Sequence, residues 1–308
     1  MTPALCAAVD IGSNTVHLLI ARLAEDGVLQ TYHEESARPL LGARRAADGM
    51  IPPAAEADVL AALRHYQNLA AALHAARFLV VATEAVRAAP NGAELISRWQ
   101  RTLDVPIHVL TSAQETRLAM LGAYSGAIPE AGLFADSGGA STQVASLAGG
   151  VAHWQRSLAI GASSLTAAHL INDPPTDQQL AAADQAVRMA LATLPAPPAD
   201  TIVPVVTGGS AATLQSFGLP GCRPGTLTAN GLVQAKALLT QQASSRIAQR
   251  FGLPPERARI LGAGCLILHR LVLWSGHQTW RASVAGIREG MIRAWSADPQ
   301  GWLAGRSQ

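Results

Sequence analysis

One pattern occurs twice in this sequence and constrains its fold more than any other feature. A short apolar run ends in Asp-Ile-Gly-Ser-Asn-Thr at residues 10–15, and another ends in Asp-Ser-Gly-Gly-Ala-Ser-Thr at residues 136–142. In both copies a second apolar run, a Gly-containing turn and a third run follow, which is typical of strands joined as hairpins. The copies are 126 positions apart, counted from Asp10 to Asp136. A repeat of this length predicts two duplicated domains rather than a solenoid.

Helical and strand patterns alternate after each copy, which predicts an α/β fold. In the first half we expect helices from Pro52-Pro53 onward, over 94–103 and over about 113–124, with strands over 78–82 and 107–110. In the second half we expect helices over 178–194, 230–251 and 255–274, strands over 203–207 and 283–285, and a last helix from Gly286. The expected domains are 1–120, completed by a helix over about 287–305, and 121–286.

The bulk composition excludes several classes of function. The 308 residues suffice for two domains, and 49% hydrophobic against 14% charged residues indicates a globular protein. A net charge of +2 argues against a nucleic-acid partner bound through bulk charge. Lys236 is the only lysine, so no Gly-Lys-Ser/Thr phosphate loop is possible.

The cysteines and the apolar runs indicate a cytoplasmic protein without a membrane span. Cys6, Cys222 and Cys265 lie far apart and form no Cys-x-x-Cys pair, which excludes a disulfide framework and a zinc ribbon. They are typical of small buried residues in a reducing cytoplasm. The run over 260–268 is far shorter than the roughly 20 residues that a membrane span needs.

The repeated turns predict phosphate binding. Glycine and small polar residues allow several backbone N–H groups to point into one concavity, where they bind an anion. Asp10 and Asp136 end the preceding runs, where oxygen ligands can hold a divalent cation such as Mg²⁺ or Mn²⁺. Each turn alone is also compatible with an ordinary tight hairpin. The phosphate-binding candidates are Gly12, Ser13, Asn14, Thr15, Gly138, Gly139, Ala140, Ser141 and Thr142.

A third glycine turn, Gly208-Gly209-Ser210, follows a predicted strand and is a further phosphate-binding candidate. A purely structural strand-to-helix turn explains it equally well.

Several segments resemble the exopolyphosphatase/guanosine pentaphosphatase (Ppx/GppA) family. The turns at 10–15 and 136–142 resemble its two phosphate motifs, and residues 82–87 resemble its Thr-x-Ala-x-Arg segment. Residues 112–118 are similar to its Ser-Gly-x-Glu-Glu-Ala-Arg-Leu helix start, and 283–290 to its closing motif. The resemblance spans almost the whole chain in order and is to the short, two-domain members.

The resemblance implies duplicated actin-like domains of the ribonuclease H-like, sugar kinase/Hsp70/actin superfamily, with a metal-dependent active site in the cleft between them. It implies release of terminal phosphate from inorganic polyphosphate, guanosine pentaphosphate or both, by attack of water on a phosphoanhydride. Glu115 falls on the family's catalytic base and Arg87 on its essential arginine. Both substrates present the same terminal group, so neither is preferred. Dimerisation is common in the family, which makes a homodimer possible.

The sequence departs from the family pattern near the expected site. Gln143 stands where the family has a glutamate thought to assist metal binding, and Gln114 replaces the first of the paired glutamates. Arg259 stands where an aspartate is common. Two alternatives therefore stay open: a catalytically weak sensor that binds polyphosphate or an alarmone, and an ATP-dependent kinase of the actin fold. Arg44 and Arg45 are candidates for guiding an anionic chain.

Overall fold

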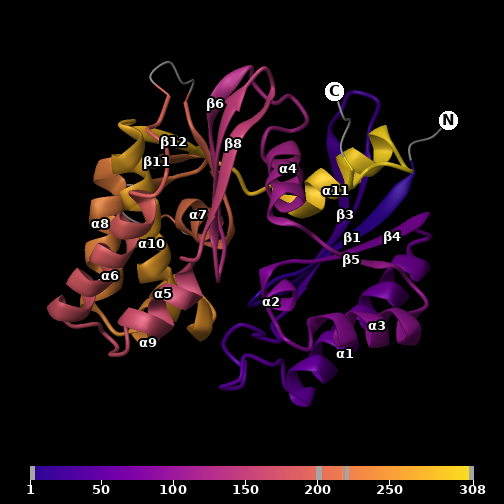
Figure 1. The fold of residues 1–308 in the computed structure, drawn as a ribbon, viewed down its shortest axis with the longest axis horizontal. Coiled ribbons are helices and arrows are strands. Elements are labelled where there is room, and N and C mark those ends of the chain that lie inside the picture. The colour runs from indigo at the N-terminus through magenta and orange to yellow at the C-terminus, as the bar shows by residue number, and fades with distance from the viewer. Residues whose placement is uncertain (1–3, 199–202, 217, 219–221, 305–308) are drawn as a thin grey trace. The chain divides into compact units, whose positions relative to one another are not determined.

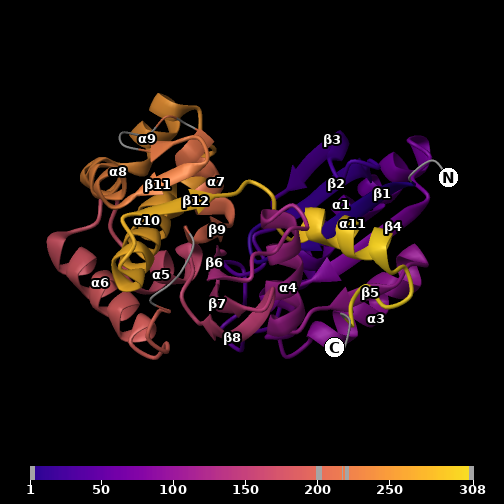
Figure 2. The ribbon, with the colours of Figure 1, turned by 90° about the horizontal axis from the view of Figure 1, so that it is seen from above.

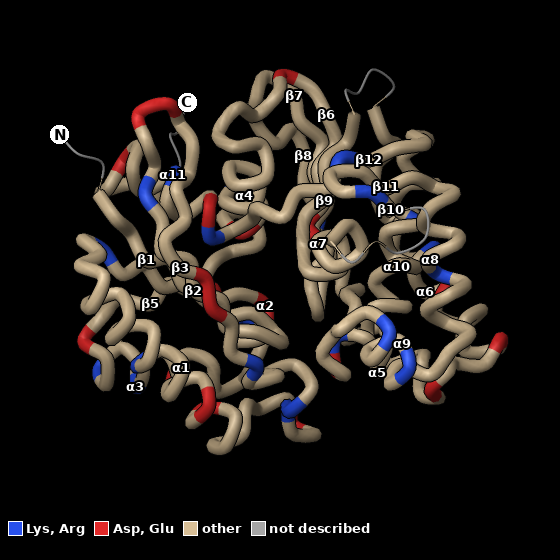
Figure 3. The backbone as a smooth tube through the Cα atoms, turned by 180° about the vertical axis from the view of Figure 1, so that it is seen from behind, with Lys and Arg blue, Asp and Glu red and all other residues tan. Residues whose placement is uncertain are grey.

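The computed structural model describes residues 4–198, 203–216, 218 and 222–304, and the chain forms two compact units. Unit 1 contains residues 1–128 and 285–308, and unit 2 contains residues 129–284. Each unit is an α/β structure built on one mixed sheet. Acidic and basic residues are interspersed in both units (Figure 3), as the small net charge leads one to expect.

Unit 1 is a five-stranded sheet covered by helices on both faces (Figure 1). Its strand order is β3-β2-β1-β4-β5; β2 is antiparallel to β1 and to β3, whereas β4 is parallel to both β1 and β5. The elements are β1 (Leu5–Ile11), β2 (Val16–Leu23), β3 (Leu29–Ala37), α1 (Pro53–Ala72), β4 (Arg77–Ala82), α2 (Glu84–Arg87), α3 (Gly92–Leu103), β5 (Ile107–Val109), α4 (Ser112–Ala123) and α11 (Ile287–Ala297).

The alternation of side chains along β1 explains the two layers of helices. Ala7, Val9 and Ile11 point into a core shared with α1 and α3, whereas Cys6 and Ala8 point into a core shared with α4 and α11. Successive side chains of a strand point to opposite faces, so a strand buried on both sides is apolar throughout. Helix α11 lies beside α4 on this second face (Figure 2).

Unit 2 repeats this topology in a seven-stranded sheet. The order β10-β11-β12-β9-β6-β7-β8 contains β8-β7-β6-β9-β12, which matches β3-β2-β1-β4-β5 strand for strand in direction. The elements are β6 (Ala131–Ser137), β7 (Thr142–Ala148), β8 (Val151–Leu158), α5 (Ala162–His169), α6 (Asp177–Leu191), β9 (Val205–Thr207), α7 (Gly209–Ser216), β10 (Cys222–Arg223), β11 (Thr226–Thr228), α8 (Ala229–Gln241), α9 (Ser244–Phe251), α10 (Pro255–Ser275) and β12 (Thr279–Ala282).

The shared strand order is the actin-like, ribonuclease H-like topology, so the predicted fold class of duplicated α/β domains is confirmed. Three element predictions are wrong. The strand expected over 283–285 is β12, which ends at Ala282, and the helix expected over 230–251 is two helices, α8 and α9, separated at residues 242–243. Helix α11 ends at Ala297. The helix expected over about 287–305 is therefore shorter than predicted, because residues 298–304 are not helical; residue 305 lies outside the described residues.

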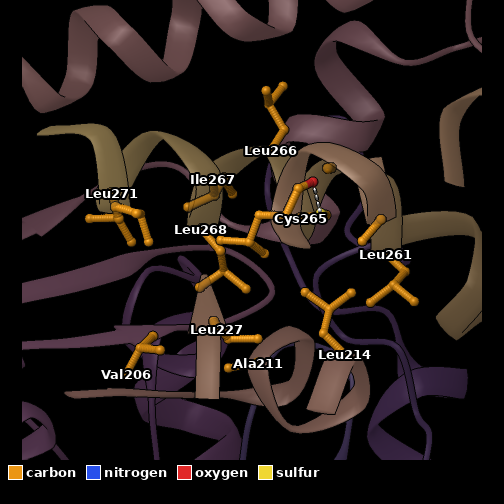
Figure 4. Close-up of a cluster of buried hydrophobic side chains, with 14 of the residues drawn as sticks. Val206, Ala211, Leu214, Leu227, Leu261, Cys265, Leu266, Ile267, Leu268 and Leu271 are labelled. Carbon is orange, nitrogen blue, oxygen red and sulfur yellow. Dashed lines mark hydrogen bonds between the residues drawn. The ribbon is translucent and has the colours of Figure 1, made fainter. Parts of the chain in front are cut away.

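Helix α10 forms the centre of the unit 2 core. Leu261, Cys265 and Leu268 pack against α7 and the sheet residues Val206 and Leu227 (Figure 4). In the described part of the chain, α10 has the length and apolar composition that a membrane-spanning helix needs. However, 72% of its apolar stretch is buried inside the structure. Length and composition of this kind are also typical of a core helix.

Candidate functional site: two glycine turns and a carboxylate–arginine cluster

The first glycine turn joins β1 to β2 and is fixed by its carbonyl groups. The N–H of Gly12 donates to the carbonyl of Thr15 (3.0 Å), which closes the turn. The carbonyls of Ser13 and Asn14 accept from the N–H groups of Gly42 (2.7 Å) and Leu40 (3.2 Å). A loop distant in sequence thus holds the oxygen side of the turn in place.

The second glycine turn, between β6 and β7, is built in the same way. Gly138 N–H donates to the Ser141 carbonyl (2.9 Å), and the N–H groups at the start of α5 take up the turn's other carbonyls. Ala162 donates to Gly138 (3.0 Å), and Ser163 donates to Gly139 (2.8 Å). The Ser164 hydroxyl donates to the Ala140 carbonyl (3.0 Å).

The two sides of each turn therefore differ. Most carbonyl groups of the turn accept hydrogen bonds from their own unit, whereas several N–H groups donate none to the backbone. Within the described residues, the N–H groups of Ser13, Thr15, Gly139, Ala140 and Ser141 donate no backbone–backbone hydrogen bond. A run of such N–H groups attracts an anion, because unpaired donors are costly unless water or a ligand accepts from them. The arrangement has the chemistry expected of a phosphate-binding turn.

Glycine at these turns serves close packing rather than unusual backbone angles. Neither Gly12 nor Gly138 adopts a positive φ; a Cβ on them would lie 3.3 and 3.2 Å from the Thr15 and Ser141 carbonyl oxygens. Gly208 differs, with φ of +104° and a Cβ position only 2.2 Å from the Ser137 carbonyl oxygen. A side chain at 208 would also lie 3.0 Å from Oδ1 of Asp136, so glycine keeps the space beside this carboxylate open.

Asp10 and Asp136 hold equivalent places in the two units. Each is the last residue but one of its strand. Each also lies opposite a polar residue on the next strand: His17 for Asp10 and Gln143 for Asp136. Gln143 is buried, and its Nε2 donates to the Ser141 hydroxyl (3.0 Å). The neutral amide of Gln143 therefore stabilises the second glycine turn through its hydrogen bond to Ser141.

Two of the predicted phosphate-binding side chains are used by the scaffold. The Thr142 hydroxyl is fully buried and donates to the Ile160 carbonyl (2.7 Å). Ser210 is buried in α7 against Gly264 of α10, where a Cβ would lie 2.0 Å from the serine hydroxyl. The Thr142 hydroxyl therefore stabilises its own turn, and Ser210 packs closely against α10.

In unit 1, a buried carboxylate and an arginine meet near the end of the sheet that carries Asp10. The Thr83 N–H donates to the Ile11 carbonyl (3.1 Å) and the Leu110 N–H to the Ala82 carbonyl (2.9 Å), so the ends of β1, β4 and β5 lie together. Glu115, on the first turn of α4, is only 6% exposed. Its Oε2 lies 3.0 Å from Nη1 of Arg87 at the end of α2.

Arg87 is oriented by two further contacts. Its Nη1 donates to the Leu110 carbonyl (2.6 Å) and its Nη2 to Oε2 of Glu84 (2.6 Å). A guanidinium group has five N–H donors, and the contacts to Glu115, Leu110 and Glu84 use three of them. The role of Glu84 was missed from the sequence, although its three-residue spacing from Arg87 in a short helix is a pattern typical of such ion pairs.

The surroundings of Glu115 alter its acidity. Burial raises the pKa of the Glu115 carboxyl above its ordinary value; the adjacent Arg87 opposes this, and the charge of Glu84 adds a smaller increase. A carboxylate with a raised pKa accepts a proton from water more readily, as a general base requires.

Arg44 and Arg45 are engaged within unit 1. Arg44 pairs with Asp58 (2.5 Å). Arg45 donates to the Ala85 carbonyl (2.5 Å) in α2, the helix that carries Arg87. These contacts give both arginines a structural role.

The donors that could hold a metal ion are sparse. Among the described residues no group of three or more His, Cys, Asp or Glu side chains has the arrangement of a metal site. Mg²⁺ commonly keeps several waters and binds through one or two carboxylates plus substrate phosphates. Within unit 2, the carboxylate of Asp136, with the open space that Gly208 leaves beside it, has the chemistry for one such ligand.

Comparison with known proteins identifies the family. Residues 19–297 match the Ppx/GppA phosphatase family. The chain belongs to this family. Exopolyphosphatase 1 of Mycobacterium tuberculosis is 28% identical over 302 residues, which covers 92% of this chain and 86% of that protein. The solved Aquifex aeolicus PPX-GPPA enzyme is 27% identical with a TM-score of 0.78, over 94% of this chain and 98% of that one.

Another solved structure, at lower sequence identity, supports the fold alone. An exopolyphosphatase from Cytophaga hutchinsonii superposes with a TM-score of 0.82 at 18% identity, over 95% of this chain and 98% of that one. The same fold thus persists at low sequence identity.

Proposed function

We propose that this Ppx/GppA-family protein hydrolyses the terminal phosphoanhydride of inorganic polyphosphate and releases phosphate, with guanosine pentaphosphate as a second candidate substrate. Family membership and the likeness to a mycobacterial exopolyphosphatase support the reaction class. The two glycine turns carry the proposal at the level of residues, because most of their carbonyls are bonded internally while several of their N–H groups donate no backbone hydrogen bond within the described residues.

In the proposed reaction, turn N–H groups and the guanidinium of Arg87 bind oxygens of the terminal phosphate. Glu115 orients a water molecule and accepts its proton as the water oxygen bonds to phosphorus. The bridging P–O bond breaks, and the shortened chain leaves with its negative charge on the former bridging oxygen. Phosphoryl transfer depends mainly on alignment and charge stabilisation, which fixed N–H groups and a guanidinium supply.

The proposal includes a divalent cation, Mg²⁺ or Mn²⁺, with Asp10 and Asp136 as its protein ligands. When bound, such a cation neutralises charge on the phosphate oxygens. The carboxylates would hold such a cation together with water ligands, because the described residues contain no group of three or more ligating side chains.

The test is phosphate release from short polyphosphate, long polyphosphate, guanosine pentaphosphate and ATP, each with and without Mg²⁺. We expect release from polyphosphate to depend on Mg²⁺ and to fall about 100-fold or more in Glu115→Gln. Glu94→Gln is the matched control, because Glu94 also lies in the first turn of a helix but is 77% exposed. Wild-type rates in Glu115→Gln would refute the mechanism.

One observation favours a second candidate function, a sensor that binds polyphosphate without turnover. Gln143 is neutral and buried opposite Asp136, so this unit offers one carboxylate fewer for a cation than the family pattern does. Tight binding of polyphosphate at saturating Mg²⁺ without phosphate release would support the sensor.

A further inference from the structure

The segment after α11, residues 299–304, returns to the helix that carries Glu115. Nε2 of Gln114 donates to the Leu303 carbonyl (3.2 Å), and Arg117 donates to the Trp302 carbonyl. The Trp302 side chain is 8% exposed and meets the His108 ring edge-to-face, with the centroids 5.8 Å apart. Side chains at 114 and 117 thus attach this segment to α4 on both sides of position 115.

Helix α4 is also fixed along its length by α11. A Cβ on Gly290 would lie 1.8 Å from the Leu118 carbonyl oxygen, and one on Gly122 would lie 1.9 Å from the Gly286 carbonyl oxygen. The two helices are therefore in backbone contact. The segment 299–304 adds side-chain contacts at the beginning of α4, through Gln114 and Arg117.

The side-chain amide of Gln114 accepts one hydrogen bond and donates another. Oε1 accepts from the Thr111 N–H (2.9 Å) at the start of α4, while Nε2 donates to Leu303. An amide both accepts and donates, whereas an ionised carboxylate only accepts. The glutamate that the family resemblance places at this position would keep the Thr111 contact and lose the one to Leu303.

We propose that Gln114 is a positioning residue that couples segment 299–304 to α4 and so fixes Glu115 for its reaction with water. The inference rests on the proposed function of Glu115. A displacement of about 1 Å in a catalytic group lowers rates by up to about 100-fold, so loss of one of several anchors is expected to lower kcat about 10-fold, with KM changing less than about 2-fold.

The central variant is Gln114→Glu, and the chain offers a matched control. Gln179 lies at the same position of the capping box of α6, accepts from the Thr176 N–H (3.3 Å) and donates through Nε2 to Asn172 (3.0 Å). Gln179→Glu therefore makes the same chemical change at the same place in a helix of the other unit. A third variant, Gln114→Met, removes the hydrogen bonds without adding charge.

Each variant is measured for kcat and KM across pH and for amide hydrogen exchange in peptides that cover α4. We expect Gln114→Glu and Gln114→Met to speed exchange at the start of α4 and to lower the plateau kcat, while Gln179→Glu does neither. If the new charge were the only effect of Gln114→Glu, the acid limb of its kcat–pH profile would move while the plateau kcat stayed at the wild-type value. That result would overturn the inference.

Two other results are equally decisive. Unchanged exchange in α4, or faster exchange at full kcat, would refute the positioning role of Gln114. A wild-type protein that releases no phosphate from any substrate would instead refute the proposed function, and with it the kinetic claim made for Gln114.

Discussion

Replacing Gly208 with alanine should destabilise unit 2 both through its backbone conformation and through its close packing. At φ of +104° a non-glycine residue pays about 1–2 kcal/mol for the left-handed backbone. The Cβ would lie 2.2 Å from the Ser137 carbonyl oxygen, and overpacking of this kind costs about 1–3 kcal/mol. The expected loss is therefore about 2–5 kcal/mol, a large part of the ordinary 5–15 kcal/mol of a folded domain.

Gly252→Ala separates the two contributions. Gly252 also has a positive φ (+62°) and belongs to unit 2, but a Cβ there meets nothing within 4 Å. Urea unfolding followed by tryptophan fluorescence should give a loss of about 1–2 kcal/mol for Gly252→Ala and a clearly larger one for Gly208→Ala. Equal losses would show that Gly208 is not in close contact with β6, and would remove the argument that it keeps space open beside Asp136.

Three further predictions concern the site and its supports. Glu84→Gln removes a charge that raises the pKa of Glu115, so the acid limb of the kcat/KM profile should move to lower pH; no movement would mean that Glu115 is not the titrating base. Gln143→Glu buries a second carboxylate opposite Asp136, so it should lower the Mg²⁺ concentration for half-maximal activity and reduce stability in metal-free buffer. An unchanged Mg²⁺ requirement would count against metal binding at Asp136. Gly290→Ala should destabilise unit 1 by about 1–3 kcal/mol in urea unfolding because α11 touches the backbone of α4; wild-type stability would contradict that contact.

The hairpins and their aspartates were predictable because local rules determine them. Apolar runs of strand length separated by Gly-containing turns predict β1-β2 and β6-β7. The break between α8 and α9 was not predictable in this way, because apolar residues continue at helical spacing through residues 242–243. Strands β10 and β11 have only two and three residues and depend on pairing with β12, which is a tertiary contact.

The candidate site could be predicted in its residue types but not in its contacts. The sequence indicated Glu115 and Arg87 separately, and the structure joins them in an ion pair with Glu84 as a second partner of the arginine. Whether a hydroxyl faces a ligand or the scaffold depends on neighbours far along the chain. Thr142 illustrates this, since its partner is the carbonyl of Ile160, which follows the end of β8.

The discontinuous make-up of unit 1 has a consequence for how the chain acquires its structure during synthesis. Residues 129–284 are contiguous and can fold as soon as they leave the ribosome, because domains generally fold as units in order of emergence. Unit 1 has to wait, since fully buried Met291 and Ile292 of α11 fill one side of its sheet. A nascent chain that stalls before residue 291 would therefore expose the apolar side of β1 and α4, and would depend on chaperones until synthesis resumes.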